Sequence, residues 1–185
     1  ILLHPDNRDL PFPVILTGPE SAAPYLEQLR AFVGATLGED AQKLYQVIVD
    51  DPAEVARQMV DGLKAVKQFR RERNDAFHFN WLLKIDEGFQ YPFDPTHEAM
   101  ADLQLTRDVP PHLLAANLRR AFSGIVAGNV KDKGIRRIEQ YGRYEIHGEQ
   151  SIMKPLDRLL QAFVEQHRMK LPGGRPYEPC YRVVT

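Results

Sequence analysis

The chain has 185 residues, which is enough for one or two domains, and its hydrophobic and charged fractions are ordinary for a globular protein. The formal net charge is −1, so no overall field attracts nucleic acid or a membrane surface, and any cationic site has to be local. No apolar run approaches the roughly 20 residues that a membrane-spanning helix needs. The single cysteine, Cys180, cannot form an intrachain disulfide, which fits a reducing, cytoplasmic location.

The first part of the chain has a strand–helix–strand–helix order. It starts at Ile1, and residues 1–3 are typical of the end of a helix, which predicts a fragment of a longer product. Short apolar runs at residues 14–18 and 45–49 each precede a helical pattern, and the first run is typical of a strand buried on both faces. This order predicts an α/β fold in which residues 1–73 are the C-terminal part of a Rossmann-like parallel sheet.

Thr17, Gly18 and Pro19 lie at the end of the first predicted strand. Ligands of doubly wound sheets bind outside the carboxyl ends of the strands, so these residues are candidates for the edge of a nucleotide site. A Thr-Gly-Pro turn is also ordinary connecting structure, and both interpretations stay open. The sequence contains neither G-x-G-x-x-G nor G-x-x-x-x-G-K-[ST], the phosphate-binding motifs of this architecture.

A strongly signalled helix begins after Asp51. Asp51 is a good N-cap, Pro52 suits the first helical position, and Glu54 places negative charge in the first turn. Apolar residues then recur at helical spacing and predict one apolar face, consisting of Val55, Met59, Leu63 and Val66.

The C-terminal half of this helix carries positive charge. Lys64, Lys67 and Arg71 follow an i, i+3, i+7 spacing that places them on one face, and Arg70 lies beside them. Cations are favoured at a helix C-terminus and are usually solvated. The same arrangement also suits a polyphosphate, so from spacing alone the face is either a solvated surface or an anion site.

Residues 74–185 predict a smaller α/β accessory domain. Alternating aromatic and polar residues at 77–85, around Trp81, predict a strand with one buried face. Further strands are expected at residues 103–105, 144–147 and 181–184, and helices at 110–127, 129–140 and from a cap at Ser151 onward. The spacing of Gly124 and Gly128 predicts a close approach between the first of these helices and a neighbour.

The residues alone reveal no catalytic constellation. The 6 histidines do not have the helical spacing of a metal site, so neither a metal nor another cofactor is expected. Asp94, His97 and Glu98 form the densest acid–base cluster, which we interpret as a loop and helix cap. Cys180, among prolines, is a poor nucleophile candidate, and no lysine has a context that suits pyridoxal phosphate.

Several segments resemble the C-terminal portion of bacterial pyrimidine/purine nucleotide 5′-monophosphate nucleosidases, which are long members of the Lonely Guy family. The resemblance covers nearly the whole chain and is carried by residues 14–19, 50–59, 79–81, 118–131, 166–173 and 179–181. It implies hydrolysis of the N-glycosidic bond of nucleoside 5′-monophosphates to free base and ribose 5-phosphate. The family's catalytic P-G-G-x-G-T-x-x-E motif does not occur in this sequence, so no catalytic residue is assigned.

The resemblance also implies a regulator and a quaternary structure. Long members of the family resemble targets of guanosine tetraphosphate, held by basic residues near a subunit interface, which implies a homo-oligomer. Lys67 and Arg71 match the family's basic positions, with Arg70 adjacent, and this favours the anion-site interpretation. The alternative function is a binding or oligomerisation module without chemistry; a lysine decarboxylase, another label used in this family, is disfavoured.

Overall fold

In a computed structural model, the described residues are 1–74 and 83–184, and the chain divides into two compact units. The first unit consists of Ile1–Gly34 and Gly38–Ile85, and the second of Ala35–Leu37 and Asp86–Thr185. Most of the strand predicted at residues 77–85 lies outside the described residues, and residues 83–85 have no regular structure. The domain boundary expected after residue 73 stays a prediction.

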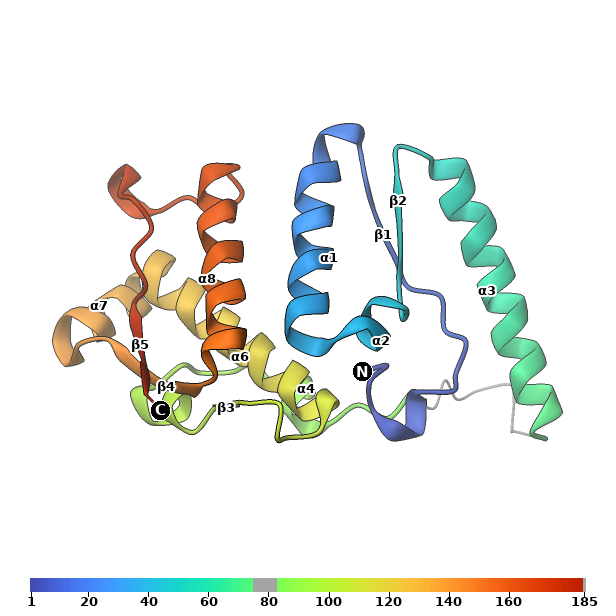
Figure 1. The fold of residues 1–185 in the computed structure, drawn as a ribbon, viewed down its shortest axis with the longest axis horizontal. Helices are drawn as coiled ribbons and strands as arrows, with labels where there is room; N and C mark the ends of the chain where they lie inside the picture. Colours follow the sequence, from blue (N-terminus) through green and yellow to red (C-terminus); the bar gives the residue numbers. More distant parts are fainter. Residues whose placement is uncertain (75–82, 185) are drawn as a thin grey trace. The chain divides into compact units, whose positions relative to one another are not determined.

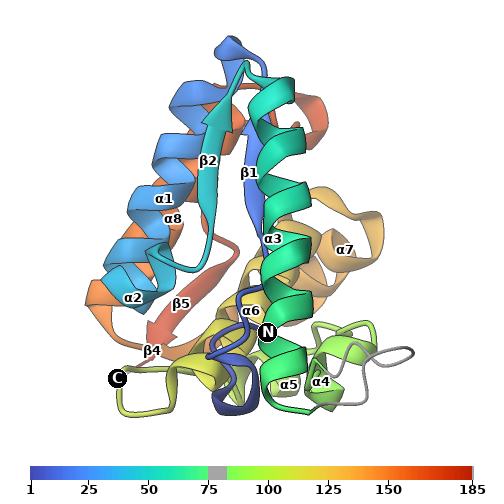
Figure 2. The same ribbon diagram turned by 90° about the vertical axis from the view of Figure 1, so that its right-hand side faces the viewer.

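The first unit contains a parallel pair of strands, as predicted. β1 (Ile15–Gly18) pairs with β2 (Gln46–Val49), with Gly18 opposite Val49 at the carboxyl ends. Figures 1 and 2 show α1 (Ala23–Leu37) on one side of this pair and α3 (Pro52–Glu72) on the other. The shorter elements are η1 (Pro5–Asn7), η2 (Glu20–Ala22) and α2 (Glu39–Gln42).

Local sequence signals set the ends of these helices. α1 ends at Gly38, whose φ of 87° lies in the left-handed region that glycine adopts without strain. The Asp51 carboxylate caps α3 by accepting a hydrogen bond from the Glu54 backbone N–H at 2.8 Å. The helix tail predicted at residues 1–3 is wrong, because a turn closed by a 3.1 Å hydrogen bond from His4 N to Ile1 O stands there.

The strands of the first unit are less buried than the sequence predicts. In β1, Ile15, Leu16 and Gly18 are half-buried and Thr17 is exposed. The described chain therefore does not bury this strand on both faces. The apolar face predicted on α3 is also only partly covered. Val66 is buried with 1% of its surface exposed, whereas Met59 and Leu63 are 37% and 39% exposed. Much of the apolar surface of α3 therefore faces solvent.

The second unit contains a three-stranded parallel sheet with the order β3-β4-β5. The strands β3 (Gln104–Leu105), β4 (Tyr144–Gly148) and β5 (Tyr181–Val184) confirm the three predictions for this region. The helical elements are α4 (Glu87–Gln90), α5 (His97–Ala101), α6 (Pro111–Val130), α7 (Asp132–Tyr141), α8 (Gln150–Glu165) and η3 (Pro172–Gly174). The chain is thus a mixed α/β protein with small parallel sheets.

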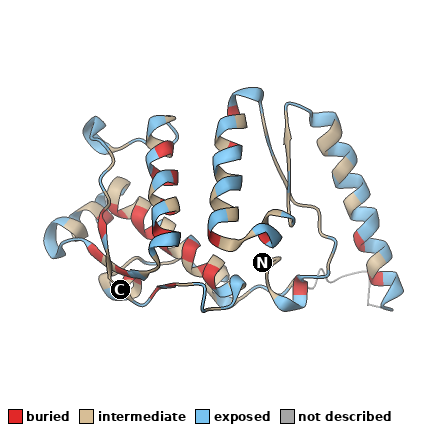
Figure 3. Ribbon diagram, in the orientation of Figure 1, coloured by how far each residue is buried: buried red, intermediate tan, exposed pale blue. Residues whose placement is uncertain are grey.

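The second unit also holds most of the buried apolar residues of the described chain, and Figure 3 shows buried positions in red along α6, α8 and β4. α6 and α8 meet through Phe122 and Phe163, whose rings pack edge to face with centroids 5.7 Å apart. The close approach predicted for α6 is confirmed. A Cβ on Gly124 would lie 2.3 Å from Met100 Sδ, and one on Gly128 would lie 2.7 Å from Cys180 Sγ.

The start of α8 differs from the prediction. Glu149 is the N-cap residue and Ser151 lies inside the first turn, where its hydroxyl donates to the Glu149 carboxylate at 3.0 Å. The sequence predicted Ser151 as the N-cap because serine is a common capping residue. The contacts of Glu149 with the end of β3 instead place the start of α8 at Glu149. Among the described helices, none combines the length and the apolar character needed to cross a bilayer.

Candidate functional site

The carboxyl ends of β1 and β2 form the first candidate site. Thr17 and Gly18 end β1, Pro19 follows, and the Asp50 backbone N–H donates to Gly18 O at 2.9 Å across the two strand ends. Gly18 also lies close to the first helical turn, because a Cβ on it would approach Ala22 Cβ to 2.9 Å. The structure thus places Thr17, Gly18 and Pro19 at the edge where ligands of parallel sheets bind.

Sequence analysis missed Asp50 at this edge. Asp50 follows β2 with a φ of 54°, a left-handed conformation that aspartate tolerates better than most residues. It is exposed, and its carboxylate makes no hydrogen bond or ion pair within the described part of the chain. The sequence signal for this position is the pair Asp50-Asp51 at the end of a predicted strand, but the helical pattern explains only Asp51, as the helix cap.

The cationic face of α3 is the second candidate site. Lys64, Lys67 and Arg71 are exposed on this face, as their spacing predicts. Lys64 pairs with Asp61 one turn earlier at 3.0 Å, an exposed ion pair that is weak in water. Lys67 makes no ion pair within the described residues, so its ammonium is available to an anion.

Arg70 differs from these three cations. Only 6% of its surface is exposed, so its side chain does not add to the exposed cationic face beside which the sequence placed it. Arg70 is buried because it follows Val66 by four residues, and this spacing places both side chains on the same, buried side of α3. Next to it, the guanidinium of Arg73 lies 3.6 Å from the centre of the Phe69 ring, a cation–π contact at the end of the helix.

The two candidate sites of the first unit lie at opposite ends of α3. Asp51 caps its N-terminus at the strand edge, whereas Lys67 and Arg71 stand in its last turns. A rise of about 1.5 Å per residue separates Asp51 from Lys67 by about 24 Å. The structure therefore does not combine the strand edge and the cationic face into one site.

The second sheet carries a polar cluster at its own carboxyl edge. The Glu149 carboxylate accepts hydrogen bonds from Thr106 Oγ1 at 2.6 Å, from Arg107 N at 2.7 Å and from Ser151 Oγ at 3.0 Å. These bonds, that from Thr106 first, lower the pKa of Glu149 from 4.5 to about 2. The hydrogen bonds from Thr106 and Arg107 join the end of β3 to the end of β4. Because Thr106, Arg107 and Ser151 all donate to Glu149, the cluster leaves few donors for a ligand.

The acid–base cluster predicted around residue 97 is a structural arrangement, as expected. Thr96 caps α5, its hydroxyl accepting from Ala99 N at 3.1 Å. His97 Nε2 lies 2.8 Å from Gly142 O. The Asp94 carboxylate accepts hydrogen bonds from Arg137 Nη1 at 2.8 Å and from Arg137 Nη2 at 3.1 Å. These contacts attach the loop before α5 to α7 and do not place an acid and a base together.

Cys180 is buried, and its environment disfavours the thiolate. Burial raises the pKa of its thiol to about 12, and Sγ contacts Ile125 O at 3.5 Å. The neighbouring phenols of Tyr177 and Tyr181 both donate to Asp157 Oδ1, at 3.1 and 2.7 Å. Burial first, then the nearby carboxylate, raises the pKa of both phenols. These groups hold the C-terminal segment on α8 and do not supply a nucleophile.

Comparison with known proteins identifies the family of this chain. Over residues 63–184 the chain matches the family described as pyrimidine/purine nucleotide monophosphate nucleosidase, C-terminal. Relatives named pyrimidine/purine nucleotide 5′-monophosphate nucleosidase from Escherichia coli K12 and O157:H7 are each 55% identical over 185 residues, covering 100% of this chain. The chain spans 40% of the length of these curated relatives. The chain therefore belongs to the pyrimidine/purine nucleotide monophosphate nucleosidase family and represents its C-terminal region.

Proposed function

We propose that this chain is part of a nucleosidase that hydrolyses the N-glycosidic bond of purine and pyrimidine nucleoside 5′-monophosphates. The bond between ribose C1′ and the base nitrogen breaks, and water supplies a hydroxyl to C1′ and a proton to the base. The observation that carries the proposal is the 55% identity to the Escherichia coli nucleosidase, which extends over the whole chain. The parallel strands in the first unit support a Rossmann-like arrangement of this region.

The contribution of this chain to that reaction is the edge of the nucleotide site. Thr17, Gly18 and Pro19 form one side of the carboxyl edge, and the exposed residue Asp50 lies across from them, its backbone N–H bonded to Gly18 O. In nucleotide-binding sheets a carboxylate after a strand accepts hydrogen bonds from ribose hydroxyls, and Asp50 suits this role. The P-G-G-x-G-T-x-x-E motif, which the family uses for phosphate binding and catalysis, is not in this sequence, so we assign no catalytic residue here.

Regulation by guanosine tetraphosphate belongs to the same proposal. Its site is the exposed cationic face of α3, where Lys67 and Arg71 are the principal contacts and Lys64 lies at the flank. Buried Arg70 adds positive potential from beneath but no direct contact. The separation of this face from the strand edge along α3 fits an effector that acts away from the substrate.

The proposal also includes a homo-oligomer and a cytoplasmic location. Its support is the apolar surface that α3 exposes beside the cationic face, where Val60 is 51% exposed next to Met59 and Leu63. Exposed apolar surface of this kind is typical of subunit contacts. The single buried thiol, with no disulfide, suits a reducing compartment.

The test is release of free base from GMP, AMP and a pyrimidine nucleoside monophosphate by the purified protein, with its intact mass measured in the same sample. We expect base and ribose 5-phosphate in equal amounts from the protein in its natural length. A natural-length protein that binds nucleotides but releases no base contradicts the enzymatic proposal. That result would leave the alternative, a nucleotide-binding or oligomerisation module, which the cationic face of α3 favours.

A further inference from the structure

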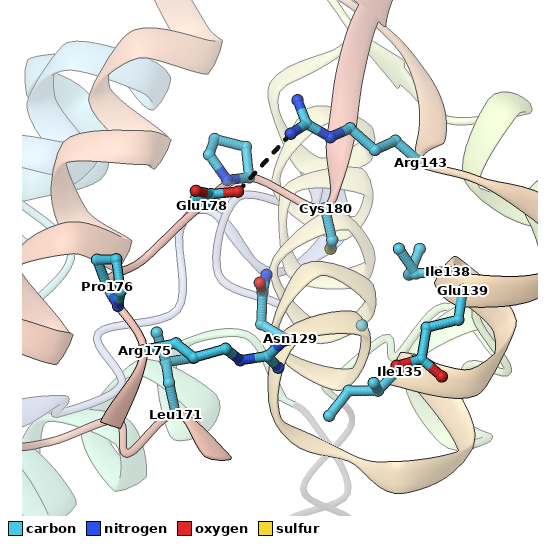
Figure 4. A pocket seen from close by; sticks show the side chains of 12 residues that line it. Asn129, Ile135, Ile138, Glu139, Arg143, Leu171, Arg175, Pro176, Glu178 and Cys180 are labelled. Carbon is cyan, nitrogen blue, oxygen red and sulfur yellow. Dashed lines mark ion pairs between the residues drawn. The ribbon is translucent and has the colours of Figure 1, made fainter. Parts of the chain in front are cut away.

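A pocket in the second unit belongs to neither candidate site. Its volume is about 270 Å³, and it lies between the end of α6, the length of α7 and the segment that leads into β5. Figure 4 shows side chains from all three walls reaching into it. We propose that this pocket binds a small zwitterion of the α-amino acid class, independently of the nucleotide chemistry proposed above.

The charges of the pocket are balanced in sign. Arg143 and Arg175 supply two guanidinium groups, and Glu139 and Glu178 supply two carboxylates. A nucleoside phosphate brings two negative charges and would meet both carboxylates as like charges. A zwitterion instead offers a carboxylate to the arginines and an ammonium to the glutamates, so every charge gains a partner.

The arrangement of these groups suits one ligand molecule. Arg143 and Glu178 already face each other at one rim, 3.9 Å apart. Arg175 and Glu139 make no ion pair within the described residues, and in Figure 4 they reach in from opposite walls. A carboxylate bound at Arg175 and an ammonium bound at Glu139 can belong to one small ligand, because both groups of an amino acid are attached to the same Cα and diverge from it at about 111°.

Between these two walls lies Asn129. Its Nδ2 donates to Ile125 O at 2.9 Å, which fixes the side chain and leaves Oδ1 as an acceptor in the pocket. An ammonium has three N–H donors, so Oδ1 can take one that Glu139 does not use.

The remaining lining is apolar and sets the size of the ligand. Ile135 and Ile138 cover the α7 side, and Leu171 and Pro179 cover the side of the C-terminal segment. Pockets for drug-sized ligands run from about 300 to 1,000 Å³, so this pocket, at about 270 Å³, is slightly smaller than that range. It suits an amino acid with an apolar or aromatic side chain better than a nucleotide with its ribose and phosphate.

The walls are held in place without a ligand. α6 and α7 meet tightly, because a Cβ on Gly134 would lie 2.2 Å from Ala127 O. The C-terminal segment is attached to β4 by a 3.0 Å hydrogen bond from Tyr144 N to Cys180 O, and to α8 through Asp157. A preformed site loses less entropy on binding than one that has to order itself.

The test is isothermal titration calorimetry of the purified protein with the standard α-amino acids at millimolar concentration. We expect binding of one or more members with an apolar or aromatic side chain. For the best ligand, removing its carboxylate charge as the amide, or its ammonium charge as the N-acetyl derivative, should each weaken binding roughly tenfold or more. Absence of binding by every amino acid overturns the proposal.

Two variants assign the contacts. Arg175→Gln should abolish the preference for the acid over the amide, and Glu139→Gln the preference for the free amine over the N-acetyl form. Lys170→Gln and Glu165→Gln, which change exposed residues outside the lining, are the matched controls and should leave both preferences intact. If the preferences for the acid over the amide and for the free amine over the N-acetyl form are the same in all four variants, the assignment of Arg175 and Glu139 as ligand contacts is wrong. Displacement of the amino acid by GMP in the same titration would likewise contradict a site that is specific for zwitterions.

Discussion

Close packing at single residues decides much of the architecture of the second unit. Gly128 is the clearest example, because a Cβ there would lie 2.7 Å from Cys180 Sγ and 3.2 Å from Tyr144 Cε2. No side chain fits between α6 and the start of β5 unless one of them moves. The absence of a side chain at this position thus lets α6 support both β4 and β5.

Gly128→Ala should destabilise the protein by about 1–3 kcal/mol through overpacking, although alanine is the better helix former. The measurement is the free energy of unfolding from urea titration. Ser123→Ala, on the exposed side of the same helix, is the control and should stay within about 0.5 kcal/mol of the parent. A stable Gly128→Ala variant would show that the contact with Cys180 relaxes easily.

Glu149 gives the protein a specific acid sensitivity. Its pKa is lowered from 4.5 to about 2 in the folded state, so its contribution to stability is complete above the unfolded pKa near 4.5. That contribution is lost as the pH falls from there toward 2, because the folded carboxyl must then accept a proton.

Glu149→Gln should therefore lower stability at neutral pH and flatten the decline of the unfolding free energy on acidification. Urea unfolding at a series of pH values below neutrality measures both effects. Glu165→Gln, at an exposed carboxylate that accepts from Gln161 at 3.0 Å, is the control. An acid decline of unchanged slope in Glu149→Gln would rule out Glu149 as its source.

At the scale of elements, α3 is the segment whose sequence signals are strongest. Asp51 caps it at 2.8 Å, and its first turn also has Pro52 and Glu54. Asp51→Ala should cost about 0.5–2 kcal/mol of stability, because the Glu54 backbone N–H loses its acceptor. Asp61→Ala removes an exposed ion pair on the same helix and should cost clearly less. Equal losses in the two variants, measured by urea unfolding, would contradict the capping argument.

The C-terminal half of α3 carries the proposed effector site. Arg71→Ala should weaken the binding of guanosine tetraphosphate by about 1–3 kcal/mol, since a charge-assisted contact is lost. Lys67→Ala should act in the same direction. Arg57→Ala is the control, because Arg57 is exposed on the same helix but pairs with Glu54. Unchanged affinity of the Arg71 variant in calorimetry would return this face to the solvated interpretation.

For the whole molecule, the exposed apolar residues of α3 lead to a prediction about assembly. Val60 is 51% exposed, and a charge there would be buried in any subunit contact that covers it. Val60→Asp should lower the mass in light scattering toward that of one chain. Ala65→Asp, on an exposed position of the same helix, should leave the mass unchanged. A monomeric parent protein would contradict the homo-oligomer.

Local sequence patterns predicted most elements but not every detail of their ends. Helical periodicity and capping residues predicted α3 and α7, and apolar runs predicted the described parallel strands, because these signals arise from backbone hydrogen bonding within or next to the element. Asp50 was missed because a left-handed residue after a strand has no periodic signature. The burial of Arg70 was missed because spacing gives only the rotation of a side chain, and a neighbouring surface decides whether that side is covered.

The sequence by itself determined the parallel α/β character, the cap of α3 and the family of the chain, since each depends on residues that are close together or matched in order. Only the tertiary structure showed that Glu149 joins β3 to β4 and that Arg175 and Glu139 line one pocket. These residues are far apart in the chain, and packing of apolar surfaces, which acts without regard to sequence separation, brings them together. Fold class is therefore encoded locally, whereas the pocket exists only once the second unit has packed.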